Sequence, residues 1–351
     1  MRGISVKGSS LWSEVSSSRY FGVLVGLVGL ILLLSLTQPT FLTVANWQEI
    51  ARSQSVAWLL ALGSTYVILT VGIDLSIASQ VAVAGMAFGL TLNAGVNIWL
   101  ALLVALASGL LMGFVNGYFI GIARISFFVV TLATLSIYQS IALLSTNAQT
   151  ISLFTNESFL RMSDLINGLV GPVPIVFVFV VVLYVLGAFV LGRTRFGRSV
   201  YAVGSNVEAA RLSGIPTRWI YVSVYTISGL TCGLASLVAV GRLSAASPIA
   251  DPNLTLAIVA AVLIGGVAFT GGDGKLFGTF LGVLFLGLIQ NGISLVGISS
   301  FWQGLVSGLI LLVAVGLGVL RDHEWVRRLS SRRLPRSIDE SADDILLKEA
   351  T

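Results

Sequence analysis

The chain of 351 residues is 56% hydrophobic and only 10% charged, and its mean hydropathy is +0.97. A soluble domain has about a quarter of its residues charged, so this composition excludes an ordinary soluble protein and predicts one that crosses a membrane several times. We therefore attribute the net charge of +5 to membrane topology and lipid contact, and expect no binding to nucleic acid.

Charged residues mark the limits of the predicted spans, because a charge at the centre of a bilayer costs roughly 2.5–3.5 kcal/mol on insertion scales. Eight stretches without Asp, Glu, Lys or Arg are each long enough for one or two helices of about 20 residues. They predict an all-α polytopic membrane protein with about ten transmembrane helices, near residues 20–37, 53–71, 77–94, 98–121, 126–145, 173–192, 219–241, 254–270, 276–291 and 301–320.

Basic residues predict the orientation of these helices. With the first residue inside, seventeen of the 20 Lys and Arg residues fall in inner segments, and only Arg52, Arg161 and Arg242 fall in outer ones. Cytoplasmic segments carry such an excess, so both termini are predicted to be cytoplasmic. The predicted parts are a cytoplasmic leader (1–19), a transmembrane domain (20–320) and a cytoplasmic tail (321–351).

Two patterns inside the apolar part concern helix packing. Gly109, Gly113, Gly117 and Gly121 lie on one face of the fourth predicted helix, which favours close packing against another helix. The pattern L-S-x-A-S follows both the second and the seventh predicted helix, once inside and once outside. This is compatible with an inverted repeat of helices two to five and seven to ten, although five residues of low complexity also match by chance.

A polar stretch, residues 193–218, separates the sixth and seventh predicted helices and carries five arginines and Glu208. Asn206 can cap a short helix with Glu208 in its first turn, and Gly214 can end it. A helix that rests on lipid needs a strong apolar face. Residues 207–214 instead carry several small side chains, which favours close docking into a groove of another protein.

Several motifs in this stretch and beyond it resemble those of one transporter family. Glu208-Ala209-Ala210-x-x-x-Gly214 is similar to the E-A-A-x-x-x-G signature of bacterial ABC importer permeases. Roughly residues 40–320 resemble the ribose, xylose and galactose permease family. The motifs that carry this resemblance are T-R-F-G-R at 194–198, Y-A-V-G-S-N at 201–206, R-L-S-G-I at 211–215, G-I-D-L-S at 72–76, V-N-G at 115–117, A-A-V-L-I-G-G at 260–266 and G-G-D-G at 271–274.

The resemblance implies a transport subunit, not an enzyme, that forms the pathway for a sugar across the bacterial cytoplasmic (inner) membrane. It implies three partners: a cytoplasmic ABC ATPase that holds ATP and Mg, an extracytoplasmic sugar-binding protein, and a second copy of the chain or a related permease. No G-x-x-x-x-G-K-[ST] motif occurs in the chain, so we expect no nucleotide cofactor on it. His323 is the only histidine, so we expect no metal site either. The helix at 201–216 is implied to couple to the ATPase, with the candidate contacts Glu208, Ala209, Ala210, Arg211, Gly214, Arg195 and Arg198.

Polar residues near the spans are candidates for the substrate pathway, because polar groups in a membrane face the protein interior and a sugar needs hydroxyl partners and aromatic faces. Asp74 is read either as a gate near the coupling region or as a solvated carboxylate at the interface. The other candidates, for which helix packing or interhelical hydrogen bonding is the commoner role, are Asn116, Phe127, Phe128, Thr131, Thr134, Gln139, Gln290, Asn291 and Trp302.

Charged residues in the outer loops are candidates for contact with the binding protein, or are ordinary solvated loop charges. They are Arg242, Asp251, Glu157, Arg161 and Asp164.

Three other functions remain open at this point. A nucleoside or amino-acid ABC permease would have the same scaffold. An ion-coupled secondary transporter would carry charges inside its spans, where this chain has nearly none. A membrane enzyme would need a histidine cluster, paired acids or an activated nucleophile, and none is visible. Thr255 and Ala257 stand where the sugar family often has acidic residues, which leaves other sugars, polyols and related solutes open.

Overall fold

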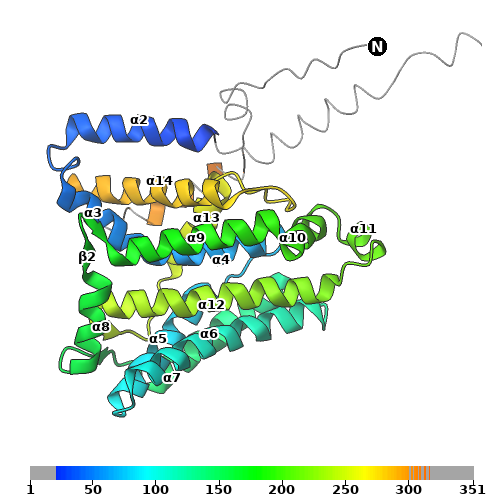
Figure 1. Cartoon of the computed structure of the whole chain (residues 1–351), viewed down its shortest axis with the longest axis horizontal. Coiled ribbons are helices and arrows are strands. Elements are labelled where there is room, and N and C mark those ends of the chain that lie inside the picture. The colour runs from blue at the N-terminus through cyan, green and yellow to red at the C-terminus, as the bar shows by residue number, and fades with distance from the viewer. Residues whose placement is uncertain are drawn as a thin grey trace, which may run out of the picture.

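The structure is a computed structural model that describes residues 21–299, 302, 304–306, 308, 309, 312, 313 and 316. It is a bundle of helices, with four two-residue strands (Figure 1). The helices are α2 (Phe21–Thr37), α3 (Val44–Ser53), α4 (Ser55–Leu69), α5 (Ile77–Asn93), α6 (Ile98–Gly121), α7 (Phe127–Ser145), α8 (Glu157–Asn167), α9 (Ile175–Arg193), α10 (Arg195–Ser205), α11 (Val207–Leu212), α12 (Thr217–Leu243), α13 (Pro252–Ile264) and α14 (Leu276–Leu295). The strands are β1 (Ile151–Ser152), β2 (Leu169–Val170), β3 (Val173–Pro174) and β4 (Ala245–Ala246).

Within the described residues, a helix lies at each of the first nine predicted spans. Five of these helices, α6, α7, α9, α12 and α14, are long and apolar enough to cross a membrane. The other four, α2, α4, α5 and α13, are shorter apolar helices. The tenth predicted span, 301–320, lies largely outside the described residues, and the leader 1–19 and tail 321–351 lie wholly outside them. The total of about ten spans and the inverted repeat stay predictions.

Helix α12 runs through the middle of the bundle and packs against α4, α5 and α6. The glycines spaced by four along α6 allow the closest of these contacts. A Cβ atom on Gly113 would meet the carbonyl oxygen of Tyr225 and the backbone of Gly229, and one on Gly109 would meet the Gly229 carbonyl. The sequence prediction of close packing through this face is confirmed, because any larger side chain would force the two helices apart.

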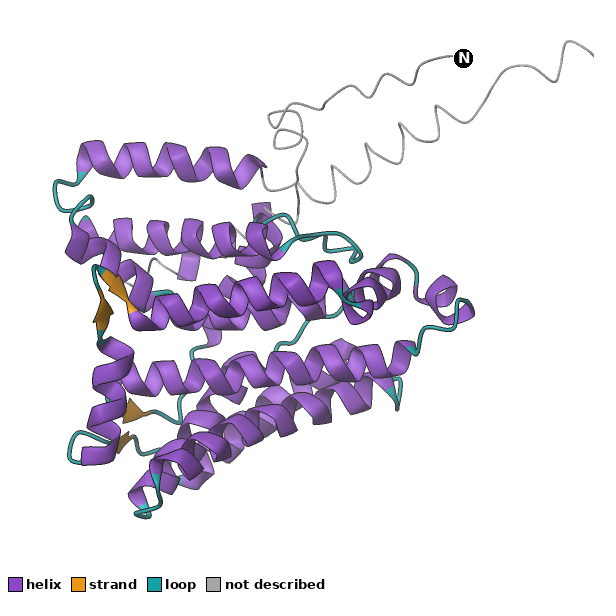
Figure 2. Cartoon of the chain, viewed as in Figure 1, coloured by secondary structure: helices purple, strands orange, loops and turns teal. Residues whose placement is uncertain are grey.

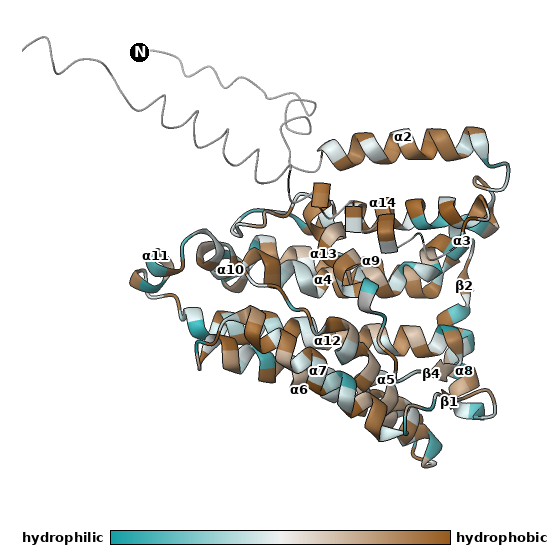
Figure 3. Cartoon of the chain, turned by 180° about the vertical axis from the view of Figure 1, so that it is seen from behind, coloured by the Kyte–Doolittle hydropathy of each residue, from teal (hydrophilic) through white to brown (hydrophobic). Residues whose placement is uncertain are grey.

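The largest group of buried side chains surrounds α4, which is buried along almost its whole length. Trp58 of α4 stacks on Phe280 of α14 with ring centroids 4.9 Å apart, and its indole N–H donates to the Phe280 carbonyl at 3.1 Å. The outward faces of α2, α6, α7 and α9 instead expose large hydrophobic side chains, and the ribbon of α2 is coloured largely as hydrophobic (Figure 3). An apolar outer face around a packed interior suits a lipid environment.

The bundle has two different ends (Figure 2). At the end that we call the α8 end, the short helices α3 and α8 lie beside the antiparallel strand pairs β1–β4 and β2–β3. At the α11 end, helices α10 and α11 connect α9 to α12. The sequence prediction left the segments of α3 and α8 as loops, because each carries charged residues and is too short for a span. The N-caps of α3 and α8, Thr43 and Asn156, are the local signals for them.

Candidate functional site

Helix α10 holds the polar 193–218 stretch against the bundle. Thr194 caps the helix by accepting the backbone N–H of Gly197 at 3.1 Å. The side chains of Val200 and Val203 are buried in the same core as α4. A Cβ atom on Gly204 would meet the carbonyl oxygen of Leu69, so the backbones of α10 and α4 touch directly. The sequence predicted one short helix in this stretch, and α10 is a second one that it missed.

Helix α11 follows and is defined by caps at both ends. Asn206 accepts the backbone N–H groups of Glu208 and Ala209 at 3.0 and 2.9 Å. At the other end the Gly214 N–H donates to the Arg211 carbonyl, the next N–H donates to the Ala210 carbonyl, and Gly214 has φ +80°. This is the Schellman arrangement, which requires a left-handed residue and therefore favours glycine. The short helix predicted between Asn206 and Gly214 is confirmed, whereas residues 201–216 are not one helix, because Tyr201 to Ser205 belong to α10.

The surface of α11 is largely open. Ala210 is buried against the bundle, whereas Glu208, Ala209 and Arg211 are exposed. Arg211 donates through Nε and Nη2 to the two carboxylate oxygens of Glu208, each at 2.9 Å. These bonds and the arginine charge lower the pKa of the Glu208 carboxyl, and the carboxylate raises the pKa of Arg211. The pair is therefore ionised at neutral pH and gives α11 a fixed polar pattern.

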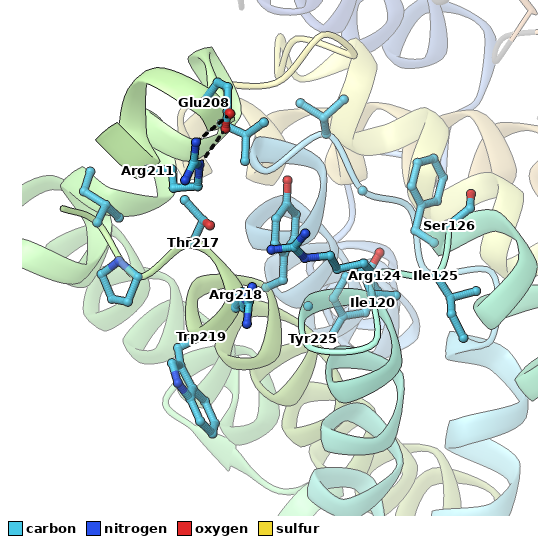
Figure 4. A pocket seen from close by; sticks show the side chains of 18 residues that line it. Ile120, Arg124, Ile125, Ser126, Glu208, Arg211, Thr217, Arg218, Trp219 and Tyr225 are labelled. Carbon is cyan, nitrogen blue, oxygen red and sulfur yellow. Dashed lines mark hydrogen bonds and ion pairs between the residues drawn. The ribbon is translucent and has the colours of Figure 1, made fainter. Parts of the chain in front are cut away.

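All seven candidate coupling residues lie at the α11 end. Five belong to α11 or its C-terminal turn, and Arg195 and Arg198 are exposed in the first turn of α10. Beneath α11 is a pocket of about 860 Å³, bounded by the turn between α6 and α7 and by the start of α12 (Figure 4). Arg124 and Arg218 line this pocket, and neither was a candidate from sequence.

Asp74 is at the centre of a buried hydrogen-bond network. Its Oδ1 accepts the backbone N–H and the hydroxyl of Ser76 at 2.9 and 2.6 Å, and its Oδ2 accepts from Gln80 Nε2 at 2.9 Å. Asn116 donates to the Ser76 hydroxyl at 2.9 Å and accepts from the Tyr138 hydroxyl at 3.3 Å. Asp74 is only 4% exposed, so the alternative of a solvated interface carboxylate is wrong. The network joins the α4–α5 loop to α5, α6 and α7.

The remaining pathway candidates do not gather at one place. Thr131 and Thr134 are buried on α7 and bond to their own helix, and Gln139 holds the Pro248 carbonyl at 2.9 Å. Phe127 packs against the core, whereas Phe128 and Trp302 are more than half exposed. The candidates on α14 face the N-terminal part of the chain, Asn291 bonding to Asn46 and Gln290 to Gln54.

Gln54 and Gln290 also line a small cavity of about 110 Å³ between α4, α13 and α14. Gln54 Nε2 donates to Gln290 Oε1 at 3.3 Å. The other walls are mostly aliphatic, with Ala257, Ile258 and Leu286 among them. The two amides are the main polar groups of this cavity, whose volume is below the roughly 300–1,000 Å³ of ligand pockets.

The candidate docking residues lie at the α8 end. Glu157, Arg161 and Asp164 are exposed on α8, and Asp251 caps α13 by accepting the Asn253 N–H at 2.9 Å. Arg242 is more enclosed.

Arg242 donates to the Ser53 carbonyl at 3.4 Å and pairs with Glu49 at 3.6 Å. Glu49 is an exposed partner that the sequence did not single out. Both charges thus come from elements that meet only in the folded chain, the end of α12 and helix α3.

Comparisons with known proteins relate most of the chain to transport permeases. The model of the family described as "Branched-chain amino acid transport system / permease component" matches residues 46–315. The chain is 36% identical over 313 residues to the ribose import permease protein RbsC of Escherichia coli (strain K12), covering 86% of this chain and 96% of that protein. It is 35% identical over 295 residues to the ribose import permease protein RbsC of Bacillus subtilis (strain 168), covering 84% and 91%.

The D-allose transport system permease protein AlsC of Escherichia coli (strain K12) is 32% identical over 307 residues, with 87% of this chain and 91% of that protein covered. No solved structure matches the chain significantly.

Proposed function

The chain belongs to the permease-component family of branched-chain amino acid transport systems, and on this premise we propose that it is the membrane subunit of an ATP-driven sugar importer. Two observations support the proposal. The ribose and allose permeases match along at least nine-tenths of their own length. The helices are apolar enough for a multi-pass protein of the bacterial inner membrane.

The observation that carries the coupling role is the exposure of α11. A six-residue helix capped at both ends projects from the bundle and leaves Glu208, Ala209 and Arg211 open (Figure 1). An isolated helix of this length is marginal in water, so its caps and its seat on the bundle hold it ready for a partner. We assign that partner as a cytoplasmic ABC ATPase, which binds ATP and Mg and docks on α11.

Movement of α11 has a direct route into the transmembrane helices. Helix α10 contacts α9, α4 and α12, and its Gly204 touches the end of α4. A rigid contact of this kind transmits displacement because packed backbones cannot be compressed. When the ATPase dimer closes on ATP, the docked helix therefore shifts α4 and α12, and the pathway changes from inward-facing to outward-facing. ATP drives the change only because the ATPase binds it differently in the two states.

The solute pathway that we propose passes the amide-lined cavity between α4, α13 and α14. Gln54 and Gln290 supply both donors and acceptors there, which suits the hydroxyl groups of a sugar. The Asp74 network is assigned a different role. Its oxygens are already bonded to Ser76 and Gln80, so it positions α5 and α6 instead of binding solute.

The α8 end is the proposed contact for an extracytoplasmic sugar-binding protein. Glu157 and Arg161 on α8 offer exposed charges of both signs. This assignment agrees with the sequence prediction, which puts seventeen of the 20 Lys and Arg residues in inner segments and makes both termini cytoplasmic. A second copy of the chain, or a related permease, completes the pathway.

A second solute class follows from the family's own description, which refers to branched-chain amino acids. Nucleosides are a further alternative on the same scaffold. We favour a sugar because the ribose and allose permeases cover most of the chain. Thr255 is buried and Ala257 lines the cavity where acidic residues stand in many sugar permeases, so the particular sugar is left open.

Uptake into vesicles tests the proposal. Right-side-out proteoliposomes contain the chain and its ATPase, with ATP loaded inside and the binding protein added outside. We expect ATP-dependent, vanadate-sensitive accumulation of a labelled pentose or hexose, and none with leucine or a nucleoside. Uptake driven by a proton gradient with the chain alone would reject an ABC importer and indicate an ion-coupled secondary transporter.

A further inference from the structure

The pocket beneath α11 carries a net positive charge that the coupling role does not use. Arg124, Arg211 and Arg218 come from three segments, the α6–α7 turn, α11 and the start of α12, and Glu208 is the one acidic residue that lines the pocket (Figure 4). Three positive charges face one negative charge in a volume of about 860 Å³. Such an excess attracts an anion, because the positive charges repel one another and a bound anion reduces that repulsion.

Two of these arginines are free to bind a ligand. Arg211 is already held by Glu208, whereas within the described residues Arg124 and Arg218 form no ion pair or side-chain hydrogen bond. Arg124 has a left-handed backbone with φ +60°, a conformation that costs an arginine free energy. Its charge nevertheless faces the pocket, near enough to contribute to the lowered pKa of Glu208.

Apolar side chains also line the pocket, beside the polar side chains of Ser126, Thr217, Tyr221 and Tyr225. Ile120, Ile125, Phe127 and Trp219 line it, and Trp219 is 59% exposed at the first turn of α12. Tryptophan at the end of a transmembrane helix is typical of the level of the lipid head groups. A pocket that combines Arg124 and Arg218 with these apolar side chains fits a molecule with an anionic head and an apolar body.

We propose that this pocket binds the head group of an anionic phospholipid. The phosphate lies between Arg124 and Arg218, since guanidinium groups bind phosphate oxygens in a bidentate manner, and the first acyl methylenes lie against Ile125 and Phe127. Basic pockets between transmembrane helices bind anionic lipid heads in this way. A carboxylate from a partner protein would match the charge of the arginines but would leave the apolar side chains of Ile125 and Phe127 uncovered.

A lipid at this position would lie where the end of α6 and the start of α12 already touch, since a Cβ atom on Gly121 would meet the Arg218 carbonyl oxygen. It would bridge the α6–α7 turn, through Arg124, to the start of α12, through Arg218, directly beneath α11. Binding is a property of this chain alone and does not depend on which solute is transported.

Native mass spectrometry of the purified full chain, titrated with phosphatidylglycerol or phosphatidylcholine, tests the proposal. We expect phosphatidylglycerol to bind more tightly. Arg124→Gln and Arg218→Gln should each weaken that binding about fivefold, and the double variant about 25-fold. Arg193→Gln, which removes an exposed arginine outside the pocket at the same end, should bind like the wild type.

Two further measurements separate a folding defect or a free anion from the lipid. Arg124→Lys keeps the charge and should keep the preference for phosphatidylglycerol, even if the glutamine variant proves unstable. Inorganic phosphate at millimolar concentration should not displace the lipid. Equal lipid binding by all variants, or full displacement by phosphate, would overturn the proposal. So would cross-linking from position 124 to the ATPase with unchanged lipid binding in Arg124→Gln.

Discussion

Gly204 in α10 lies against the carbonyl oxygen of Leu69 at the end of α4, with no room for a side chain between them. This contact joins the polar 193–218 stretch to the helix that is most completely buried in the bundle. It offers a rigid route by which a force on α11 and α10 reaches the interior.

Gly204→Ala should uncouple the bundle from its ATPase. The added methyl group meets the backbones of Leu69 and Gly272, which cannot move aside as a side chain would, and overpacking of this kind costs about 1–3 kcal/mol. We expect α10 to shift and ATP-driven uptake to fall at least tenfold. Recovery of the ATPase by co-purification should persist, because the open face of α11 is unchanged.

Gly192→Ala is the matched control, since a Cβ atom there has no neighbour within 4 Å. Normal uptake by Gly204→Ala would show that the α10–α4 contact has no part in coupling.

Gly214 should tolerate asparagine better than alanine. Its φ of +80° closes the Schellman turn of α11, and a left-handed conformation costs an ordinary residue about 1–2 kcal/mol, but asparagine less. We expect Gly214→Ala to reduce both ATPase recovery and uptake several-fold, whereas Gly214→Asn stays near the wild type. Equal losses in both variants would mean that space at position 214, and not the turn, controls docking.

Asp74→Asn should destabilise the chain. The carboxylate accepts hydrogen bonds on both oxygens, from Ser76 and Gln80, and an amide puts a donor opposite a donor. An unsatisfied buried polar group costs about 1–3 kcal/mol, so the thermal unfolding midpoint of the purified chain should fall. Asp164→Asn, on the exposed surface of α8, should leave the midpoint unchanged. Identical midpoints for all three proteins would remove the network's proposed role in positioning α5 and α6.

Gln290→Leu should slow solute uptake without weakening the binding of the ATPase to the chain. Replacing the amide removes a hydrogen-bond partner from the cavity that Gln290 shares with Gln54. Loss of about 1 kcal/mol for one hydrogen bond corresponds to about a fivefold lower maximal rate if the solute passes there. Ser294→Ala, one turn further along α14 and outside the cavity, is the control. An unchanged rate in Gln290→Leu would place the pathway elsewhere.

The amino-acid sequence was sufficient for features that depend on near neighbours in the chain. Charge-free stretches located nine apolar helices among the described residues, because the cost of burying a charge in lipid acts on each stretch separately. The glycines at every fourth position of α6 predicted its close approach to another helix. Asn206 and Gly214 predicted both ends of α11, since capping needs only residues within one turn.

Only the tertiary structure decided where separate segments meet. The sequence left Asp74 as either a gate or a solvated interface carboxylate, and only the packing of α5, α6 and α7 shows that it is buried. Arg124 and Arg218 are 94 residues apart and share a pocket because the ends of α6 and α12 lie together. Hydropathy and caps act within a few residues, whereas burial and charge clustering depend on which helices pack side by side, and that is decided by contacts between residues distant in the chain.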